Sequence, residues 1–239
     1  MPWSQGRYLT IFQNTKGVTA LDKTNTALVL IDVQKESEFG IEGVNTVVNN
    51  TEKLIAECRK MGIPIIYTRH INREDKIGLS NEEPLTEEDK PVFYNNGTDA
   101  VEIKDQIKPE KDDIIIDKYR WSSFYDTSLD LMLRNMGIKH LIMGGFVTDG
   151  CLMTSVFDAY FRDYQVNLVK DICGATNEGA HMASIMIMAN WVYDLAIFDT
   201  SEMIRKLNGE SYANWEATYP DQLQFTPEIM RQMFHGLNR

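Results

Sequence analysis

Six short, almost wholly apolar segments recur along the chain, and stretches with helical periodicity separate them. Short runs of this kind are typical of strands that are buried on both faces, as in a parallel sheet. The apolar segments occupy residues 26–32, 63–68, 113–117, 140–145, 165–171 and 193–199. Apolar periodicity predicts helices at 44–61, 127–136, 151–162 and 178–190. This alternation predicts an α/β fold of three layers (α/β/α), Rossmann-like, with a mostly parallel sheet of about six strands and helices on both faces.

The chain has 239 residues, which fits a single domain. We expect a core over about residues 25–206 and a C-terminal tail, rich in aromatic residues, at 207–239 that packs on another surface. An acid-rich insertion at 70–110 ("SNEEPLTEEDKP") should contain one short helix near 98–107. Such an insertion is either a lid or subunit-interface element or a solvated surface excursion, and the sequence favours neither.

The charge of the chain excludes some classes of partner. Lysine and arginine number 24 against 35 acidic residues, a formal net charge of -11, so we expect neither nucleic acid nor an anionic membrane as a partner. No apolar run approaches the roughly 20 residues of a membrane span, and the polar N-terminus lacks the apolar region of a signal peptide. We therefore expect a cytoplasmic protein. Three cysteines without a CxxC pair predict neither a disulfide framework nor a zinc ribbon.

Reactive side chains follow several of the predicted strands directly. Asp32, Arg69, Lys118 and the glycine loop that leads to Cys151 each come at a strand end. Ligands of open α/β sheets bind outside the carboxyl ends of the strands, so these groups should meet at one edge. Taken singly, each residue has an ordinary structural interpretation. Asp32 could be a turn residue, Lys118 a surface cation and Cys151 a small buried side chain. Their convergence favours a functional site.

Cys151 is predicted to lie where a loop becomes a helix. The partial positive charge of a helix N-terminus and a nearby Lys118 ammonium should lower the pKa of the thiol. Asp32 could accept the thiol proton, and free backbone N–H groups of the first turn could hold an oxyanion. The sequence therefore predicts a nucleophilic cysteine supported by an acid and an ammonium group.

Three motifs resemble those of the isochorismatase-like cysteine hydrolases, over roughly residues 25–200. The motifs are "ALVLIDVQ" (27–34), "IDKYRWSSFYDTSL" (116–129) and "GFVTDGCLMTSVFDA" (145–159). The family includes nicotinamidases and N-carbamoylsarcosine, ureidoacrylate and biuret hydrolases. The resemblance implies a catalytic triad of Asp32, Lys118 and Cys151. It also implies a cis peptide bond between Phe146 and Val147, and an oxyanion hole formed by the N–H groups of Val147 and Cys151.

The activity implied by the resemblance is hydrolysis of an amide or carbamoyl C–N bond of a small molecule through a thioester, releasing ammonia or an amine, without a cofactor. One alternative is the vinyl-ether hydrolysis of true isochorismatases, whose cysteine lies one position later in the loop and is not a nucleophile. A loop that starts at Gly144 would place Gly150 at the nucleophile position, whereas the spacing from Gly145 to Cys151 to Ser155 is that of the thiol-dependent enzymes. A second alternative is a non-catalytic relative that binds a metabolite or a protein, and the complete triad disfavours it.

The segment that follows the second predicted strand can be compared with the metal-binding motif of one branch of the family. Nicotinamidases bind a metal through Asp-x-His after the second strand, but "YTRHINRED" has no aspartate two residues before His70, so we expect no metal and an ordinary loop role for His70.

Arg69, or secondarily Arg73, suits a carboxylate or polarised carbonyl, although Arg69 could instead pair with the acidic insertion. Further candidates to line the pocket are Gln34, Phe39, Trp121 and Tyr125. By resemblance we expect a homodimer or homotetramer in which a neighbouring subunit could complete the pocket.

Overall fold

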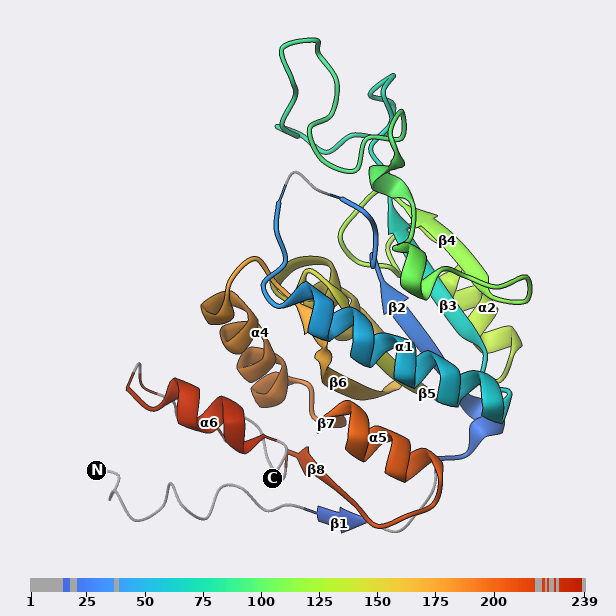
Figure 1. The fold of residues 1–239 in the computed structure, drawn as a ribbon, viewed down its shortest axis with the longest axis vertical. Helices are drawn as coiled ribbons and strands as arrows, with labels where there is room; N and C mark the ends of the chain where they lie inside the picture. Colours follow the sequence, from blue (N-terminus) through green and yellow to red (C-terminus); the bar gives the residue numbers. More distant parts are fainter. Residues whose placement is uncertain are drawn as a thin grey trace.

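The computed structural model describes residues 15–17, 21–36, 39–217, 221, 223, 226 and 228–237. Within these residues, one sheet runs through the molecule with eight strands in the order β1-β8-β7-β6-β5-β2-β3-β4 (Figure 1). The strands are β1 (Thr15–Gly17), β2 (Thr26–Ile31), β3 (Ile65–His70), β4 (Ile114–Lys118), β5 (His140–Phe146), β6 (Gln165–Gly174), β7 (Leu195–Phe198) and β8 (Tyr212–Glu216). The strands from β7 to β4 pair in parallel, whereas β8 and β1 add an antiparallel edge.

The parallel strands coincide with the six apolar segments of the sequence, so the predicted fold class is confirmed. The strand order changes direction at β2 and β5, which are neighbours in the sheet. From β2 the chain proceeds outward through β3 and β4, and from β5 it proceeds the other way through β6 and β7. Loops diverge at such a switch point and leave a crevice at the carboxyl ends of the strands. The crevice therefore lies between the loops that follow β2 and β5.

Helices cover both faces of the sheet. The larger ones are α1 (Val44–Met61), α2 (Leu129–Asn135), α3 (Met153–Tyr160), α4 (Glu178–Trp191), α5 (Thr200–Leu207) and α6 (Met230–Gly236). Apolar residues of α1 and α5 pack together on one face, in front of the sheet in Figure 1, and those of α2, α3, α4 and α6 pack on the other. Burying a side chain such as Leu54 or Leu133 in these layers contributes about 1.5–3 kcal/mol to the stability of the fold. This packing holds the strands, and the residues at their ends, in place.

Parts of the fold depart from the sequence-based expectations. The single short helix expected near 98–107 is wrong, because two separate 3-10 turns occur there, Asp99–Val101 and Asp105–Ile107. Thr98 caps the first turn by accepting the Ala100 N–H, and extended backbone at Glu102 ends it. Among the described residues, no helix combines the length and the apolar character that crossing a membrane requires.

The insertion extends beyond the carboxyl ends of β3 and β4, as the teal and green loops at the top of Figure 1 show. It returns upon itself through bridges between Asn72 and Asn95 and between Leu85 and Pro91. Asn72 also donates to the carbonyl of Phe93 at 3.0 Å. These contacts give the insertion a defined course next to the crevice of the sheet.

Candidate active site

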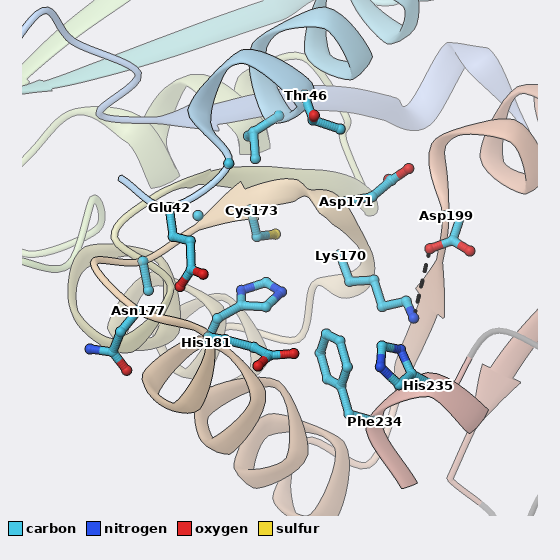
Figure 2. A pocket seen from close by; sticks show the side chains of 15 residues that line it. Glu42, Thr46, Lys170, Asp171, Cys173, Asn177, His181, Asp199, Phe234 and His235 are labelled. Atoms are coloured by element: carbon cyan, nitrogen blue, oxygen red, sulfur yellow. Dashed lines mark ion pairs between the residues drawn. The ribbon is translucent and has the colours of Figure 1, made fainter. Parts of the chain in front are cut away.

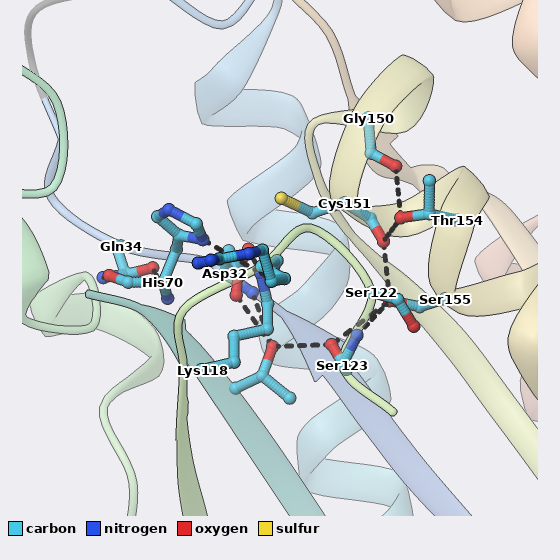
Figure 3. Close-up of polar contacts among 12 residues, drawn as sticks. Asp32, Gln34, His70, Lys118, Ser122, Ser123, Gly150, Cys151, Thr154 and Ser155 are labelled. Carbon is cyan, nitrogen blue, oxygen red and sulfur yellow. Dashed lines mark hydrogen bonds and ion pairs between the residues drawn. The ribbon is translucent and has the colours of Figure 1, made fainter. Parts of the chain in front are cut away.

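The structure brings Asp32, Lys118 and Cys151 together at the crevice (Figure 3). Asp32 directly follows β2, Lys118 ends β4, and Cys151 lies in the π-helical turn Thr148–Leu152 that precedes α3. The Lys118 Nζ lies 2.6 Å from Asp32 Oδ2, and neither side chain is exposed to solvent. A carboxylate oxygen of Asp32 and the Cys151 sulfur lie within 4.8 Å of each other. The arrangement places a carboxylate between an ammonium group and a thiol.

Hydroxyl groups hold the carboxylate of Asp32 and connect it to the Cys151 turn. Thr68 Oγ1 donates to Asp32 Oδ1 at 2.8 Å, and Ser123 Oγ donates to Thr68 Oγ1 at 3.3 Å. Ser155 Oγ lies 3.2 Å from Ser123 Oγ and donates to the Cys151 carbonyl at 2.6 Å. All three hydroxyl residues are buried. Four different segments are therefore tied together behind the reactive groups, and sequence reasoning had assigned no role to Thr68, Ser123 or Ser155 in this network.

The Lys118 ammonium meets three acceptors: Asp32 Oδ2, the Arg120 carbonyl at 3.1 Å and His70 Nδ1 at 3.4 Å. Burial alone would lower the pKa of Lys118, but attraction to Asp32 and Cys151 outweighs it, so the pKa is raised and the group stays charged. Burial and the neighbouring Lys118 lower the pKa of His70 to about 4, so its neutral ring can accept at Nδ1. His70 is thus a buried β3 residue that contacts the triad, not the ordinary loop residue expected.

The pKa of the Cys151 thiol is shifted in the opposite direction to the one expected from the sequence. Burial, followed by the nearby Asp32 carboxylate, raises the pKa of Cys151, and Lys118 opposes them only in part. The expected lowering of this pKa is therefore wrong, because loss of hydration disfavours a thiolate more than one ammonium group stabilises it. The raised pKa favours the protonated thiol, so a thiolate would form by transfer of its proton to a neighbouring base.

Gly145 lets the loop that carries Cys151 approach the strand that carries Asp32. Its φ is +126°, and a Cβ at this position would lie 2.1 Å from the carbonyl oxygen of Ile31 in β2. A side chain is incompatible with this approach. The next peptide bond, Phe146–Val147, is cis, as the resemblance implied.

A cavity of about 370 Å³ opens onto Cys151. Its lining comes from the loop after β2, the end of β3, the insertion, the loop after β4 and the Cys151 turn. The lining residues are Phe39, His70, Glu83, Pro84, Phe93, Tyr94, Trp121, Val147, Asp149, Gly150 and Cys151. Phe39 and Trp121 were candidate substrate contacts. Besides His70, at the end of β3, four lining residues (Glu83, Pro84, Phe93 and Tyr94) belong to the insertion, which therefore forms a wall of this cavity.

A smaller cavity of about 280 Å³ adjoins Asp32, and its lining includes Gln34, Lys35 and Lys104. Phe39 and Tyr94 line both cavities, and their rings meet edge to face with centroids 5.8 Å apart. The side chain of Gln34 accepts from the His70 N–H at 2.8 Å and donates to the His70 carbonyl at 3.0 Å. Gln34 therefore joins the ends of β2 and β3 in addition to lining this cavity.

Two of the candidate substrate contacts lie outside both cavities. Arg69 donates to both carboxylate oxygens of Asp117, at 2.7 and 3.0 Å, and to Glu102 at 3.3 Å. Tyr125 is 56% exposed and lines neither cavity. Arg69 thus pairs with Glu102 of the insertion, as one of its two expected roles foresaw, and also with Asp117 of β4, which was not expected.

Another cavity, of about 600 Å³, lies between α1, β6, α4 and α6, and no member of the triad lines it (Figure 2). Lys170 lies 3.8 Å from Asp199 in this cavity and sits over the ring of Phe234 at 4.8 Å. His181 reaches from it toward the Cys151 turn, with Nδ1 2.9 Å from Thr148 Oγ1. Burial, followed by Lys170, lowers the pKa of His181 to about 4.

Metal-ligand atoms of Asp32, His70 and Cys151 lie within 4.8 Å of one another. The Lys118 ammonium contacts two of these three groups, so a cation at the same place would have to displace it. The absence of a catalytic metal remains a prediction.

Comparison with known proteins places the chain in a family. A family model for the isochorismatase domain matches residues 26–197. Ureidoacrylate amidohydrolase RutB of Acinetobacter baylyi is 26% identical over 72% of this chain and 82% of that protein. An Arabidopsis thaliana protein named as a probable inactive nicotinamidase is 32% identical over 70% of this chain and 89% of that protein.

A crystal structure of a cysteine hydrolase from Pseudomonas syringae pv. phaseolicola has the same fold, with a TM-score of 0.71 at 24% identity, and covers 82% of this chain and 98% of that one. The matched family domain spans β2 to β7 and so includes every strand that supplies the crevice. The chain belongs to the isochorismatase family of hydrolases.

Proposed function

We propose that this protein is a cysteine-dependent amidohydrolase that cleaves an amide or carbamoyl C–N bond of a small molecule through a thioester. The observation that carries the proposal is the buried pair of Asp32 and Lys118, 2.6 Å apart, beside a cysteine that opens onto a cavity. A charged acid without solvent and next to a thiol is suited to take the proton of that thiol. The RutB relative of Acinetobacter baylyi is named for an activity of the same chemical class, that of a ureidoacrylate amidohydrolase.

The proposed reaction begins with the protonated thiol that the raised pKa of Cys151 indicates. As the sulfur attacks the substrate carbonyl, its proton moves to Asp32, so a free thiolate never has to persist in the buried site. Asp32 then gives the proton to the departing nitrogen, and the C–N bond breaks as the thioester forms. Water, deprotonated by Asp32, hydrolyses the thioester, releasing the acid and restoring the thiol.

Lys118 keeps its charge throughout and offsets the charge of Asp32 in each of these steps. The N–H groups of Val147 and Cys151 are proposed to hold the oxyanion of the tetrahedral intermediates. Both residues line the cavity into which the reacting carbonyl would have to enter. Donors fixed by the backbone stabilise such an oxyanion by about 3–4 kcal/mol each in water-excluded sites.

The proposal is tested by measuring ammonia release from small carboxamides and ureido compounds. Cys151→Ala should lose turnover and stay folded, and Cys151→Ser should be nearly as poor because an alcohol is far harder to ionise. Cys58, a free cysteine on the buried face of α1, supplies the control: Cys58→Ala should keep its activity. Full activity in Cys151→Ala would overturn the proposal and favour the thiol-free chemistry of isochorismatases. A tightly bound compound that survives unchanged would favour a binding protein.

A further inference from the structure

We propose that the Cys151 cavity takes substrates whose non-reacting part is flat and aromatic or apolar, and uncharged or cationic, and that it disfavours substrates with a carboxylate in that part. The inference rests on the proposed function for the position of the reacting carbonyl, which has to lie against Cys151. This substrate class differs from the one expected from the sequence, in which Arg69 would bind a carboxylate of the substrate.

Aromatic rings, with the imidazole of His70, are carried by five of the eleven residues that line the cavity. Phe39 packs against Phe93 with ring centroids 5.7 Å apart, and Tyr94 packs edge to face on Phe39. His70 lies against Tyr94 at 5.0 Å. Trp121 also lines the cavity, yet 63% of the residue remains exposed. An indole that is open to solvent beside a cavity offers a free face on which a flat group can stack.

The charges that line the cavity have one sign. Glu83 and Asp149 contribute carboxylates, and among the described lining residues none is a lysine or an arginine. The Glu83 carboxylate is fixed in position because it accepts from the Asn72 side chain at 2.7 Å. A substrate carboxylate placed here would be repelled by the two acids, whereas a cation would be attracted to them and to the ring faces.

Two of the cations near the cavity are already engaged by acidic partners. Arg69 is paired with Asp117 and Glu102, and the Lys118 ammonium is in contact with Asp32. The lowered pKa of His70 leaves its ring uncharged at neutral pH. None of these groups is therefore available to a substrate carboxylate without losing an existing partner.

The neighbouring cavity on the Asp32 side offers the main competing arrangement. It contains Lys35, which is 2.9 Å from Asp105, and Lys104. Cys151 does not line it, and the rings of Phe39 and Tyr94 stand at its boundary with the Cys151 cavity. A substrate bound at the sulfur therefore meets the aromatic walls before it can reach either lysine.

The test uses three benzamides of similar shape that carry a tert-butyl, a trimethylammonium or a carboxylate group in the para position. Acetamide and 3-ureidoacrylate complete the panel. The wild-type kcat/KM for ammonia release should be at least about tenfold higher for the neutral and cationic benzamides than for the carboxylate. A carboxylate that is turned over equally well or better, in the benzamides or in 3-ureidoacrylate, would overturn the inference.

Two pairs of variants identify the residues responsible. Trp121→Ala should lower kcat/KM for the neutral benzamide about tenfold, mainly through KM, and should lower it far less for acetamide, because only the larger amide reaches the indole. Trp191→Ala removes another half-exposed tryptophan, at the end of α4, and should change neither. Glu83→Gln should reduce the preference for the cation over the carboxylate, whereas Glu88→Gln, an exposed insertion acid outside the cavity, should not.

Binding to Cys151→Ala, followed by tryptophan fluorescence, separates this inference from the proposed function. If the compounds bind in the predicted order but wild-type enzyme hydrolyses none, the proposed function fails and the substrate class stands. If wild-type enzyme hydrolyses the carboxylates best, and Lys104→Met removes that activity, the hydrolase stands and the substrate class fails. Absence of binding by all three benzamides would also overturn the substrate class.

Discussion

Lys118 and Asp32 form an ion pair at 2.6 Å in which neither side chain is exposed. Removing two charges from water is costly, and their attraction repays the cost only while both partners are present. The pair is therefore expected to contribute little net stability while making each partner indispensable to the other. Its position beside Cys151 agrees with the proposed catalytic role of the pair.

Removing one partner of this pair should unfold the protein more readily. Lys118→Met leaves the Asp32 carboxylate buried without compensation and should cost about 3–5 kcal/mol in the free energy of unfolding, measured with urea. The double variant Asp32→Asn, Lys118→Met should regain most of that loss and remain inactive. An active double variant would contradict the assigned roles.

The hydroxyl group of Thr68 is expected to support turnover because it donates a hydrogen bond to the Asp32 carboxylate. Thr68→Val removes the hydrogen bond to Asp32 Oδ1 and the contact to Ser123, and should lower kcat by about 10- to 100-fold. The loss of a buried hydrogen bond should cost about 1–3 kcal/mol of stability. Thr51→Val is the control, since Thr51 is equally buried but bonds only within α1, so stability should fall while kcat is retained.

Gly145 should not tolerate even a methyl group. Gly145→Ala would force its Cβ against the Ile31 carbonyl at 2.1 Å and should cost more than about 3 kcal/mol. Gly137 also has a positive φ, of +71°, but nothing lies within 4 Å of its Cβ position. Gly137→Ala should therefore cost only about 1 kcal/mol. Equal losses of Tm in the two variants would show that backbone conformation, not the close approach of β5 to β2, decides.

Buried histidines should make the protein sensitive to mild acid. The pKa of His181 falls from 6.5 to about 4 on folding, chiefly through burial, so below pH 6.5 the unfolded chain binds the extra proton. Stability should therefore fall as pH decreases from about 6.5 toward 4, with about 2 kcal/mol lost for this group between pH 7 and 5. His181→Gln should flatten that dependence in urea unfolding curves, and a variant of the exposed His235 should leave it intact.

The residues that the sequence placed correctly are those whose position follows from the ends of apolar strands. Asp32, Lys118 and Cys151 each follow or end a strand of the parallel sheet, so the topology alone brings them to one edge. The edge strands β1 and β8 and helix α5 were not foreseen. Strand β8 is a short mixed segment, YANWE, without the apolar run that marks a buried parallel strand.

The parts of the site that were not predicted from the sequence depend on contacts between segments that are distant along the chain. Glu83, Phe93 and Tyr94 come from an insertion whose course is set by local turns and bridges, not by a periodic pattern. The pairing of Arg69 with Asp117 became evident only from the register of β3 with β4. The pKa of Cys151 was expected in the wrong direction because charges can be read from a sequence, whereas the degree of burial cannot.

The central claim is that the Cys151 sulfur forms a covalent bond to the substrate. The most direct measurement is acid quenching of the enzyme during turnover of a slow amide, followed by peptide mass spectrometry. We predict that the peptide carrying Cys151 gains the mass of the substrate acyl group and loses it in hydroxylamine, and that Cys58 and Cys173 stay unmodified. Turnover with no acyl adduct on Cys151, and undiminished in Cys151→Ala, would contradict the account.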